Sequence, residues 1–406
     1  MQIAYFTNTY FPVVSGVVQC IHTFRRSLSQ QGHNVFIFAQ NAKECTGNDP
    51  CVFRYPAFTL PTHPNYPITV PISQQVNALL PTLNLDVIHT HHPFLLGSTA
   101  AGQATRLNLP LVFTFHTRYQ EYSHYVPFNQ TLVKAAIKAY LAHFMQQCHH
   151  IIVPSNSIKA QLAEDYGITR QITAIPMGLD RSLWAAANGQ AVRRARGWGN
   201  DTVLISVGRL AKEKNWPTLL RAAAPILRTR PHTRLVLIGD GVERNSLETL
   251  AQNLGVADRV EFTGTLDHTQ VIAHLKAADL FCFASITETQ GLVTLEAMAA
   301  GLPVVAVDAT GTRDAVTHER EGLLTDNDAL ALTQALCRVL DNPTLRNRLA
   351  NAALQQAQAF DAEEQARKMV SVYQQARQDQ RAGRTVQINR SKSWLRGYAF
   401  PQSVGW

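Results

Sequence analysis

The residues of this sequence best placed to do chemistry are two glutamates, Glu288 and Glu296, which flank the start of a predicted helix. An apolar run of strand length, residues 279–284, comes shortly before them, and apolar residues recur at helical spacing after Gly291. A carboxylate repels phosphate but accepts hydrogen bonds from hydroxyl groups. Two glutamates alone would indicate only a solvated surface loop. Their coincidence with a glycine and a helix start favours a site that binds hydroxyls.

The first turn of this helix offers an anion site beside the two carboxylates. The backbone N–H groups of Gly291, Leu292 and Val293 would have no partner within the helix, and they lie at the positive end of its dipole. Such a helix start binds phosphate, and a glycine lets a bulky anion approach the backbone closely. Phosphate next to several hydroxyls describes a nucleotide sugar.

Two cationic residues follow another predicted strand, residues 202–207. Arg209 comes directly after Gly208, and Lys214 lies five residues further on. Both would lie at the carboxyl end of a strand, where they could reach a diphosphate. A solvated basic turn is the simpler reading of a lone lysine, but an arginine directly after a buried strand and a glycine favours the diphosphate.

The turn 238–241 (IGDG) also follows a predicted strand and resembles the start of a dinucleotide fingerprint. Arg244 stands where the third glycine of that fingerprint would be. We therefore expect Gly239 to lie in a turn that contacts the nucleotide, and we do not expect an NAD site. The D-x-D run 326–328 could suggest a metal, but a turn and a helix N-cap explain it better.

The N-terminal half carries weaker candidates. Ser15 and Gly16 open a predicted helix and form a second possible anion site, although every strand–helix unit needs a turn there. His116 follows the apolar strand 109–115 at its carboxyl end. A single histidine among 15 is more often structural, and three others remain rivals because they share a similar placement: His89, His91 and His92.

Composition limits the class of protein. The 406 residues are 46% hydrophobic and 16% charged, which is ordinary for a globular protein with two full cores. No apolar run approaches the length that spans a bilayer, and the chain starts directly with a strand. The six cysteines are scattered without a C-x-x-C pair, so we expect free thiols in an intracellular, cytoplasmic protein.

The net charge of +8 is unevenly distributed. The first 178 residues hold ten Lys and Arg against six Asp and Glu, and the last 26 hold five basic residues and no acid. These two regions suggest an anionic surface as partner. No nucleic-acid-binding motif accompanies the charge, so a membrane surface is favoured over nucleic acid.

Strand and helix signals alternate throughout, which predicts an α/β fold with parallel sheets. We expect an N-terminal domain over residues 1–178, a second over 179–360, and a C-terminal helix and tail over 361–406. Residues 178–201 have no strong period and look like a domain boundary. Two doubly wound domains would face a cleft, with ligands beyond the carboxyl ends of the strands.

Two segments have alternative interpretations. Residues 131–150 predict either a core helix with a basic outer side, which we favour slightly, or a helix that contacts a membrane. The tail 381–406 combines basic and aromatic residues, which suits either an interfacial anchor or a segment that packs back on the first domain.

Together these residues resemble the retaining glycosyltransferases of family 4 (GT4), which have the GT-B architecture of two Rossmann-like domains. The specific marker is the E-x7-E spacing of Glu288 and Glu296 followed by residues 297–305 (AMAAGLPVV). The resemblance extends to about residue 377. Residues 9–12 with 15–18, 116–119 with 124–125, and 288–291 look most like the branch that glucosylates diacylglycerol. Other branches more often have an aromatic residue where Gln290 stands.

The resemblance implies a role for each matching position. Arg209 and Lys214 would bind the donor diphosphate together with Gly16, Gly291, Leu292 and Val293, Gly239 would contact the nucleotide, and Glu296 would hold the ribose. His116 and Glu288 would contact the transferred sugar. Asn8, Tyr119 and His124 would lie on the acceptor side. Asn8 stands where relatives commonly have Asp, and Met177 where many have Asn.

The family also implies a mechanism without a metal or other cofactor, in which electrostatic stabilisation of the leaving diphosphate supplies most of the catalysis. We therefore expect transfer of a hexose, with glucose favoured, from a UDP-sugar to a membrane glycerolipid such as diacylglycerol or a glycosyl-diacylglycerol. The enzyme would be peripheral at the inner face of the cell membrane. The alternatives are a GT4 transferase of polysaccharide or lipopolysaccharide synthesis, a nucleotide-sugar epimerase, and a non-catalytic nucleotide-sugar binder. The sequence leaves the oligomeric state open.

Overall fold

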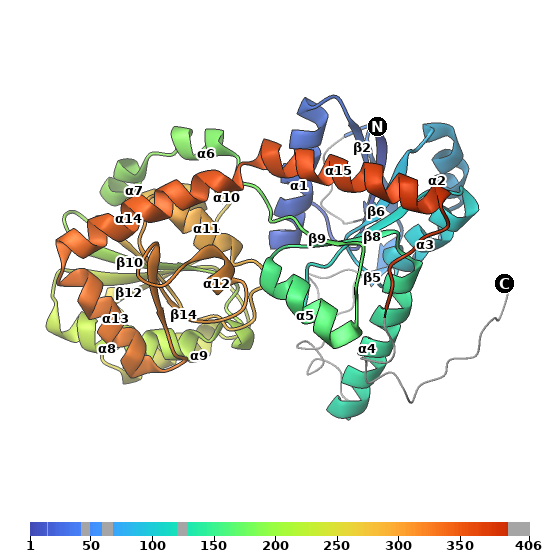
Figure 1. Ribbon diagram of the computed structural model, residues 1–406. Helices are drawn as coiled ribbons and strands as arrows, with labels where there is room; N and C mark the ends of the chain where they lie inside the picture. Colours follow the sequence, from blue (N-terminus) through green and yellow to red (C-terminus); the bar gives the residue numbers. More distant parts are fainter. Residues whose placement is uncertain (14, 42–48, 59–67, 120–128, 389–406) are drawn as a thin grey trace. The chain divides into compact units, whose positions relative to one another are not determined.

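The computed structural model describes residues 1–13, 15–41, 49–58, 68–119 and 129–388 (Figure 1). The chain divides into two compact units. The first consists of Met1–Gly178 and the chain from Ala362 onward, and the second of Leu179–Asp361. Both are α/β units built on a parallel sheet, as predicted.

The sheet of the first unit has seven strands in the order β3-β2-β1-β6-β7-β8-β9, and every neighbouring pair is parallel. The chain order therefore reverses between β1 and β6, which is where an open α/β sheet binds its ligands. Its strands are β1 (Gln2–Thr7), β2 (Asn34–Gln40), β3 (Val52–Tyr55), β6 (Val87–Thr90), β7 (Leu111–Thr114), β8 (His150–Val153) and β9 (Ile172–Ala174). A separate antiparallel pair joins β4 (Ala57–Phe58) to β5 (Ile68–Thr69).

Helices connect these strands, and several begin at residues that cap them. Ser15 accepts a hydrogen bond from the Val18 N–H, and Ser155 accepts one from the Ile158 N–H. The C-cap Gly167 has a left-handed backbone at φ +65°, as glycine readily does. The helical elements are α1 (Gly16–Gln30), α2 (Gln74–Leu79), η1 (Leu80–Leu83), α3 (Leu96–Arg106), α4 (Gln130–Gln147) and α5 (Asn156–Tyr166).

The long helix α15 (Ala362–Arg381) belongs to the first unit, although the whole second unit separates it from α5 in the sequence. It lies alongside α1 (Figure 1). Beyond it, the Val386 N–H donates to the Cys148 carbonyl, and Ile388 forms a bridge with Ile168. The chain up to Ile388 therefore packs on the first unit, and the rest of the predicted tail, residues 389–406, lies outside the described residues.

The second unit has a six-stranded parallel sheet in the order β12-β11-β10-β13-β14-β15. Here the chain order reverses between β10 and β13, the strands that precede the predicted cations and the predicted E-x7-E loop. The strands are β10 (Thr202–Val207), β11 (Thr233–Ile238), β12 (Val260–Gly264), β13 (Leu280–Phe283), β14 (Val304–Val307) and β15 (Gly322–Thr325).

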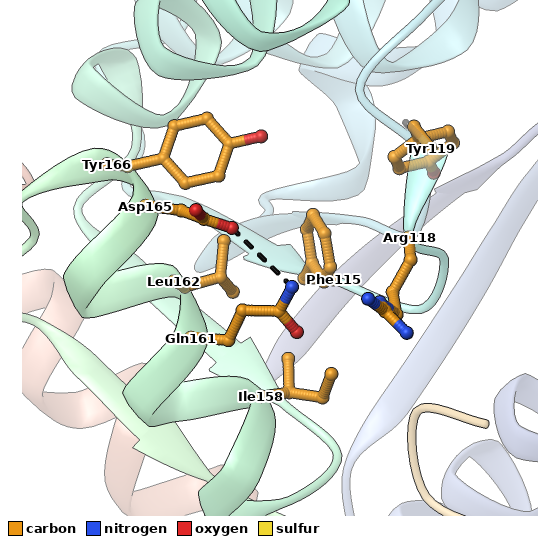
Figure 2. A pocket seen from close by; sticks show the side chains of 8 residues that line it. All are labelled: Phe115, Arg118, Tyr119, Ile158, Gln161, Leu162, Asp165 and Tyr166. Atoms are coloured by element: carbon orange, nitrogen blue, oxygen red, sulfur yellow. Dashed lines mark hydrogen bonds between the residues drawn. The ribbon is translucent and has the colours of Figure 1, made fainter. Parts of the chain in front are cut away.

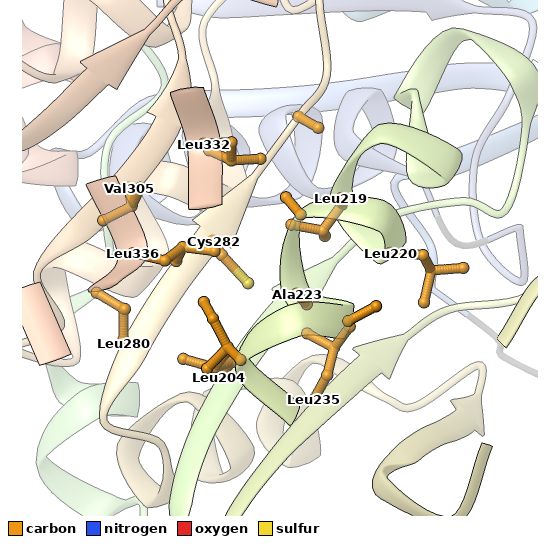
Figure 3. Close-up of a cluster of buried hydrophobic side chains, with 14 of the residues drawn as sticks. Leu204, Leu219, Leu220, Ala223, Leu235, Leu280, Cys282, Val305, Leu332 and Leu336 are labelled. Carbon is orange, nitrogen blue, oxygen red and sulfur yellow. The ribbon is translucent and has the colours of Figure 1, made fainter. Parts of the chain in front are cut away.

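Helices flank this sheet, and apolar side chains fill the space between. Figure 3 shows part of the core, where leucines of β10, β11 and β13 meet leucines of α8 and α13, with Leu204, Leu220 and Leu336 fully buried. The helical elements are α6 (Arg181–Ala186), α7 (Gly189–Ala195), η3 (Lys212–Lys214), α8 (Trp216–Thr229), α9 (Arg244–Asn253), η4 (Ala257–Arg259), α10 (His268–Ala277), α11 (Leu292–Ala299), α12 (Thr312–Ala315), α13 (Ala329–Leu340), α14 (Pro343–Ala357) and η5 (Gln358–Phe360).

The structure corrects three expectations. Residues 178–201, predicted to be irregular, contain α6 and α7, whose N-caps Asp180 and Asn188 each accept a backbone hydrogen bond. Helix α14 and strand β15 were not predicted at all. The helix predicted over residues 131–150 is α4, and its Leu132 is 67% exposed although the favoured interpretation was a core helix. No helix among the described residues is long and apolar enough to cross a bilayer.

Candidate functional site

The predicted donor residues of the second unit follow the two strands at its switch point. Gly208 and Arg209 follow β10, and the loop from Ser285 to Gly291 follows β13. Parallel strands end at the same edge of the sheet, so the fold brings together residues that are about 80 positions apart in sequence.

Two glycines allow neighbouring turns at this edge to touch. A Cβ on Gly239 would lie 2.0 Å from the Gly208 carbonyl oxygen, and one on Gly241 would lie 2.4 Å from that of Leu210. The Leu210 N–H in turn donates to the Asp240 carbonyl. Gly239 and Gly241 lie in the turn after β11, which packs directly against the backbone of the turn after β10. Glycine is needed at both positions because a side chain would clash with that backbone.

Helix α11 begins as predicted, with Gly291 as its N-cap in the left-handed region at φ +70°. The Thr294 and Leu295 N–H groups donate to the Gly291 carbonyl, and no side chain caps the helix. In the described part of the chain, no side chain thus occupies the first-turn amides of Leu292 and Val293, and their binding of an anion stays a prediction.

Lys214 and Glu288 form an ion pair within the second unit. Lys214 Nζ donates to Glu288 Oε1 at 2.5 Å, and Ser285 Oγ donates to the same oxygen at 2.7 Å. Their side chains are 20% and 12% exposed. Burial alone would raise the pKa of Glu288, but the charge of Lys214 and the two hydrogen bonds lower that pKa below its ordinary value. The carboxylate is thus ionised at neutral pH.

Arg209 also has an acidic partner. Its guanidinium Nη2 donates to Glu213 Oε1 at 2.5 Å, four residues on, and the Glu213 side chain is only 7% exposed. The Trp216 indole N–H donates to the Arg209 carbonyl and so fixes the backbone of this turn. Both predicted diphosphate cations are therefore held by carboxylates in this structure.

Glu296 lies about a turn and a half into α11, and its side chain is 5% exposed. His268, the first residue of α10, donates from Nε2 to Glu296 Oε1 at 2.8 Å. Burial would lower the pKa of His268, but this hydrogen bond and the charges of Glu296 and neighbouring acids raise it. Sequence reasoning missed His268, since no motif separates it from the other histidines.

In the first unit, the helix predicted to open at Ser15 and Gly16 is α1, and an anion-binding role for its start stays a prediction. Gly16 is the first residue of the helix, but the Ser15 hydroxyl already caps the Val18 N–H at 3.3 Å. The amides of Gly16 and Val17 remain the first-turn donors that a side chain does not cap.

His116 lies in a cluster with the three histidines that were its rivals. His91 Nδ1 lies 2.9 Å from His116 Nε2, and the two rings stack. His89 is fully buried and hydrogen-bonds Thr114 and, at 2.8 Å, the hydroxyl of Tyr373 from α15. His91, just after β6, thus contacts His116 directly, and the ring of His89 in β6 lies against that of His91 at 4.4 Å.

Burial keeps this cluster neutral. It lowers the pKa of His116 to about 3, with a smaller contribution from the charge of His92, and that of His92 to about 4. Burial and the neighbouring histidines also lower the pKa values of His89 and His91 well below the ordinary range. At neutral pH His116 is therefore an uncharged hydrogen-bonding group.

The three predicted acceptor-side residues lie in different surroundings or outside the described residues. The Asn8 carboxamide binds the backbone instead: Nδ2 donates to the Phe94 carbonyl, and Oδ1 accepts from the Leu96 N–H at the start of α3. Tyr119 lines a small, partly open pocket together with Phe115, Arg118 and side chains of α5 (Figure 2). His124 lies outside the described residues.

The D-x-D run serves helix α13, as predicted. Asp328 is the N-cap and accepts from the Ala331 N–H at 2.9 Å, and Asn327 accepts from the Asn215 amide. No group of three or more His, Cys, Asp or Glu side chains in the described part of the chain could hold a metal ion. Whether the reaction needs a metal stays a prediction.

Two family models match the chain in succession. Glycosyltransferase Family 4 matches residues 14–183, and Glycosyl transferases group 1 matches residues 190–356. The α-monoglucosyldiacylglycerol synthase of Streptococcus pneumoniae is 33% identical over 75% of this chain and 71% of its own length. The synthase of the same name from Acholeplasma laidlawii is 30% identical over 87% of this chain and 92% of its own length.

Solved structures agree on the fold. Sucrose-phosphate synthase from Thermosynechococcus elongatus superposes with a TM-score of 0.77 at 24% identity, over 92% of this chain and 98% of that one. Anabaena HepE in complex with UDP and glucose superposes with a TM-score of 0.73 at 20% identity, over 92% and 99%. With both halves matched and relatives above 30% identity, the chain belongs to glycosyltransferase family 4, has the GT-B fold and is a hexosyltransferase.

Proposed function

We propose that this enzyme transfers glucose from UDP-glucose to a membrane glycerolipid, diacylglycerol or a glycosyl-diacylglycerol, with retention of the anomeric configuration. One observation supports the assignment of a nucleotide-sugar donor. Lys214, Glu288 and the uncapped start of α11 lie at one edge of the sheet of the second unit. The acceptor half rests on the two α-monoglucosyldiacylglycerol synthases to which the chain is similar.

The donor diphosphate would lie against the first-turn amides of Leu292 and Val293, with Arg209 and Lys214 as its cations. Charge develops on this diphosphate as the glycosidic bond breaks. Donors that are already in place when charge develops stabilise the transition state more than the ground state. The Glu213 and Glu288 carboxylates are paired with these two cations, and the diphosphate would take the place of the carboxylates.

Glu288 would contact the hydroxyls of the transferred sugar, and the role proposed for His116 of the first unit is that of an uncharged hydrogen-bonding group. Glu288 is ionised and so accepts hydrogen bonds, whereas neutral His116 can donate one and accept one. The leaving phosphate would take the proton of the acceptor hydroxyl on the face from which it departs, so no protein base and no metal is required. We therefore expect turnover to persist in EDTA.

The acceptor assignment extends the resemblance in the sequence. Gln290 is the residue there that favours a lipid acceptor, and it is 8% exposed, directly before the N-cap of α11. A basic tail with Trp394 and Trp406 would attract the enzyme to an anionic membrane. We therefore propose a peripheral location at the inner face of the cell membrane.

The second candidate is a family 4 transferase with a saccharide acceptor. The glycogen synthase of Mycobacterium tuberculosis is 32% identical over 73% of this chain and 70% of its own length, which keeps this candidate open. Family membership argues against the epimerase and the non-catalytic binder.

The test is release of UDP from UDP-glucose, with and without diacylglycerol vesicles, with GDP-mannose as a second donor and glycogen as a second acceptor. The proposal predicts release that depends on both UDP-glucose and diacylglycerol. Release that ignores lipid, or that needs glycogen, would contradict the lipid acceptor. Release from GDP-mannose alone would contradict the donor.

A further inference from the structure

From the contacts of Glu296 we infer that His268 is a positioning residue for donor binding: it holds the Glu296 carboxylate in the orientation that accepts hydrogen bonds from the ribose hydroxyls of the nucleotide. This inference rests on the proposed function, in which Glu296 binds the ribose, and extends it to a residue outside the family motif.

The contact between the two residues is direct. His268 Nε2 lies 2.8 Å from Glu296 Oε1, at the normal length of a charge-assisted hydrogen bond. With its side chain 5% exposed, Glu296 has little water around it. A carboxylate in such a place needs a fixed donor, because an unpartnered buried charge is costly. His268 supplies that donor to one oxygen, and its hydrogen bond fixes the plane of the carboxylate.

Two further features hold His268 in place, and a third contact joins its neighbour Trp184 to Glu296. Asp267 caps α10 in a reciprocal capping box with Gln270, so the first turn that carries His268 is firmly formed. The ring of Trp184, from α6, packs edge-on against the His268 ring at 6.1 Å. The Trp184 indole N–H donates to the Glu296 backbone carbonyl at 3.3 Å. Residues from α6, α10 and α11 thus fix one histidine–carboxylate pair.

The two motif glutamates have partners of different kinds. Glu288 is paired with Lys214, which the diphosphate would attract, whereas Glu296 is paired with a histidine on a different helix. Donor binding would therefore disturb the first pair and leave the second in place. This is the behaviour expected of a preformed ribose site.

Two substitutions at His268 separate the hydrogen bond from the bulk of the side chain. His268→Leu removes the donor, and His268→Gln retains an N–H at a position similar to Nε2. His274→Leu is the matched control: it lies on the same helix, its ring packs edge-on against Trp198 at 5.9 Å, and its Nδ1 bonds the Gln270 carbonyl and not Glu296.

Binding of UDP and of 2′,3′-dideoxyuridine diphosphate to the full chain is measured by calorimetry, beside KM and kcat for the sugar donor. We expect His268→Leu to raise the Kd for UDP and the donor KM by roughly tenfold, the scale of one hydrogen bond to a charged group. We expect kcat within about twofold of wild type, and near-normal binding by His268→Gln and His274→Leu. For the dideoxy nucleotide, which lacks both ribose hydroxyls, wild type and His268→Leu should bind equally.

Three results distinguish a failure of the inference about His268 from a failure of the proposed function. Equal weakening of UDP and of the dideoxy nucleotide by His268→Leu would mean a structural role and overturn the inference. Unchanged UDP binding by His268→Leu would overturn it as well, while the proposed function stands. A wild-type protein that binds none of UDP, GDP and ADP would overturn the proposed function and with it the ribose contact. If GDP or ADP binds best, the same comparison is made with its dideoxy form.

Discussion

Lys214 Nζ donates a hydrogen bond of 2.5 Å to Glu288 Oε1, so a predicted diphosphate-binding cation and a predicted sugar-binding carboxylate form one ion pair. Lys214 ends the short 3-10 helix η3 after β10, and Glu288 lies in the loop after β13. In the proposed reaction Lys214 turns toward the diphosphate, while Glu288 becomes available to the sugar hydroxyls. The pair is therefore a switchable contact as well as a stabilising one.

The first prediction concerns this pair. Lys214→Ala should lower kcat by about 10²- to 10³-fold, the scale of losing one preorganised electrostatic contact to the developing charge. Lys212→Ala, on the same η3 helix but exposed, is the control and should stay near wild type. Steady-state UDP release measures both.

Stability needs its own control, because Lys214→Ala leaves the Glu288 carboxylate without its cation. The double variant Lys214→Met with Glu288→Gln removes both charges and should regain most of the lost stability without regaining activity. Full activity in Lys214→Ala, or activity that returns with stability in the double variant, would contradict the assigned role.

The second prediction concerns the support of the Glu288 loop. A Cβ on Gly311 would lie 2.7 Å from the Glu288 carbonyl oxygen, whereas one on Gly301 would meet nothing within 4 Å. Both glycines have positive φ, +82° and +83°, so alanine costs each about 1–2 kcal/mol in backbone strain. Only Gly311→Ala should also displace the Glu288 loop, because its added methyl group overpacks the contact at a cost of about 1–3 kcal/mol. We expect this displacement to lower activity tenfold or more.

Activity assays beside urea unfolding distinguish these effects. Equal losses of activity in Gly311→Ala and Gly301→Ala would show that the loop tolerates the added methyl group, and would remove the support proposed here for Glu288.

The third prediction concerns acid. His92 is neutral in the folded protein because burial lowers its pKa to about 4 from 6.5. Below pH 6.5 the unfolded chain binds the proton and the folded chain does not, so this contribution to stability is complete above pH 6.5 and falls as the pH drops toward 4. The loss is about 1.4 kcal/mol per pH unit for one histidine in the middle of this range.

His92→Asn keeps an acceptor for the Asn8 N–H, which His92 Nδ1 binds at 3.2 Å, and removes the titrating group. Urea unfolding between pH 7 and pH 4.5 should therefore show a shallower loss of stability for this variant, by about one proton. Identical slopes for the variant and wild type would contradict a neutral His92.

The sequence predicted most strands and helices because hydrophobic periodicity is strongest where an element is buried, as in β10 and β13. It missed α14, whose pattern is mixed and whose start depends on Asn342 capping the Leu345 N–H. It likewise located Glu288 and Lys214 individually, but the ion pair joins residues 74 positions apart and requires the order of the sheet. His268 had no motif, since its role depends only on what α11 places beside it.

The fourth prediction concerns the tail. The structure sets the point of truncation after Ile388, since Gln387 and Ile388 still bond the first unit at Thr169 and Ile168. Loss of residues 389–406 should weaken co-sedimentation with anionic vesicles at low salt more than at high salt. Replacing Arg390, Lys392 and Arg396 by Gln in the full chain should give most of the same effect. Unchanged binding to anionic vesicles would rule out an anchoring role for the tail.

The central claim is transfer of glucose to a glycerolipid with retention. It is tested most directly by isolating the lipid product from UDP-glucose and diacylglycerol vesicles, and determining its mass and the anomeric proton coupling by NMR. We expect a monoglucosylated diacylglycerol, or its further glucosylated form, with an α-linked sugar like that of the donor. A β-linked product, or UDP release with no glucosylated lipid, would contradict it.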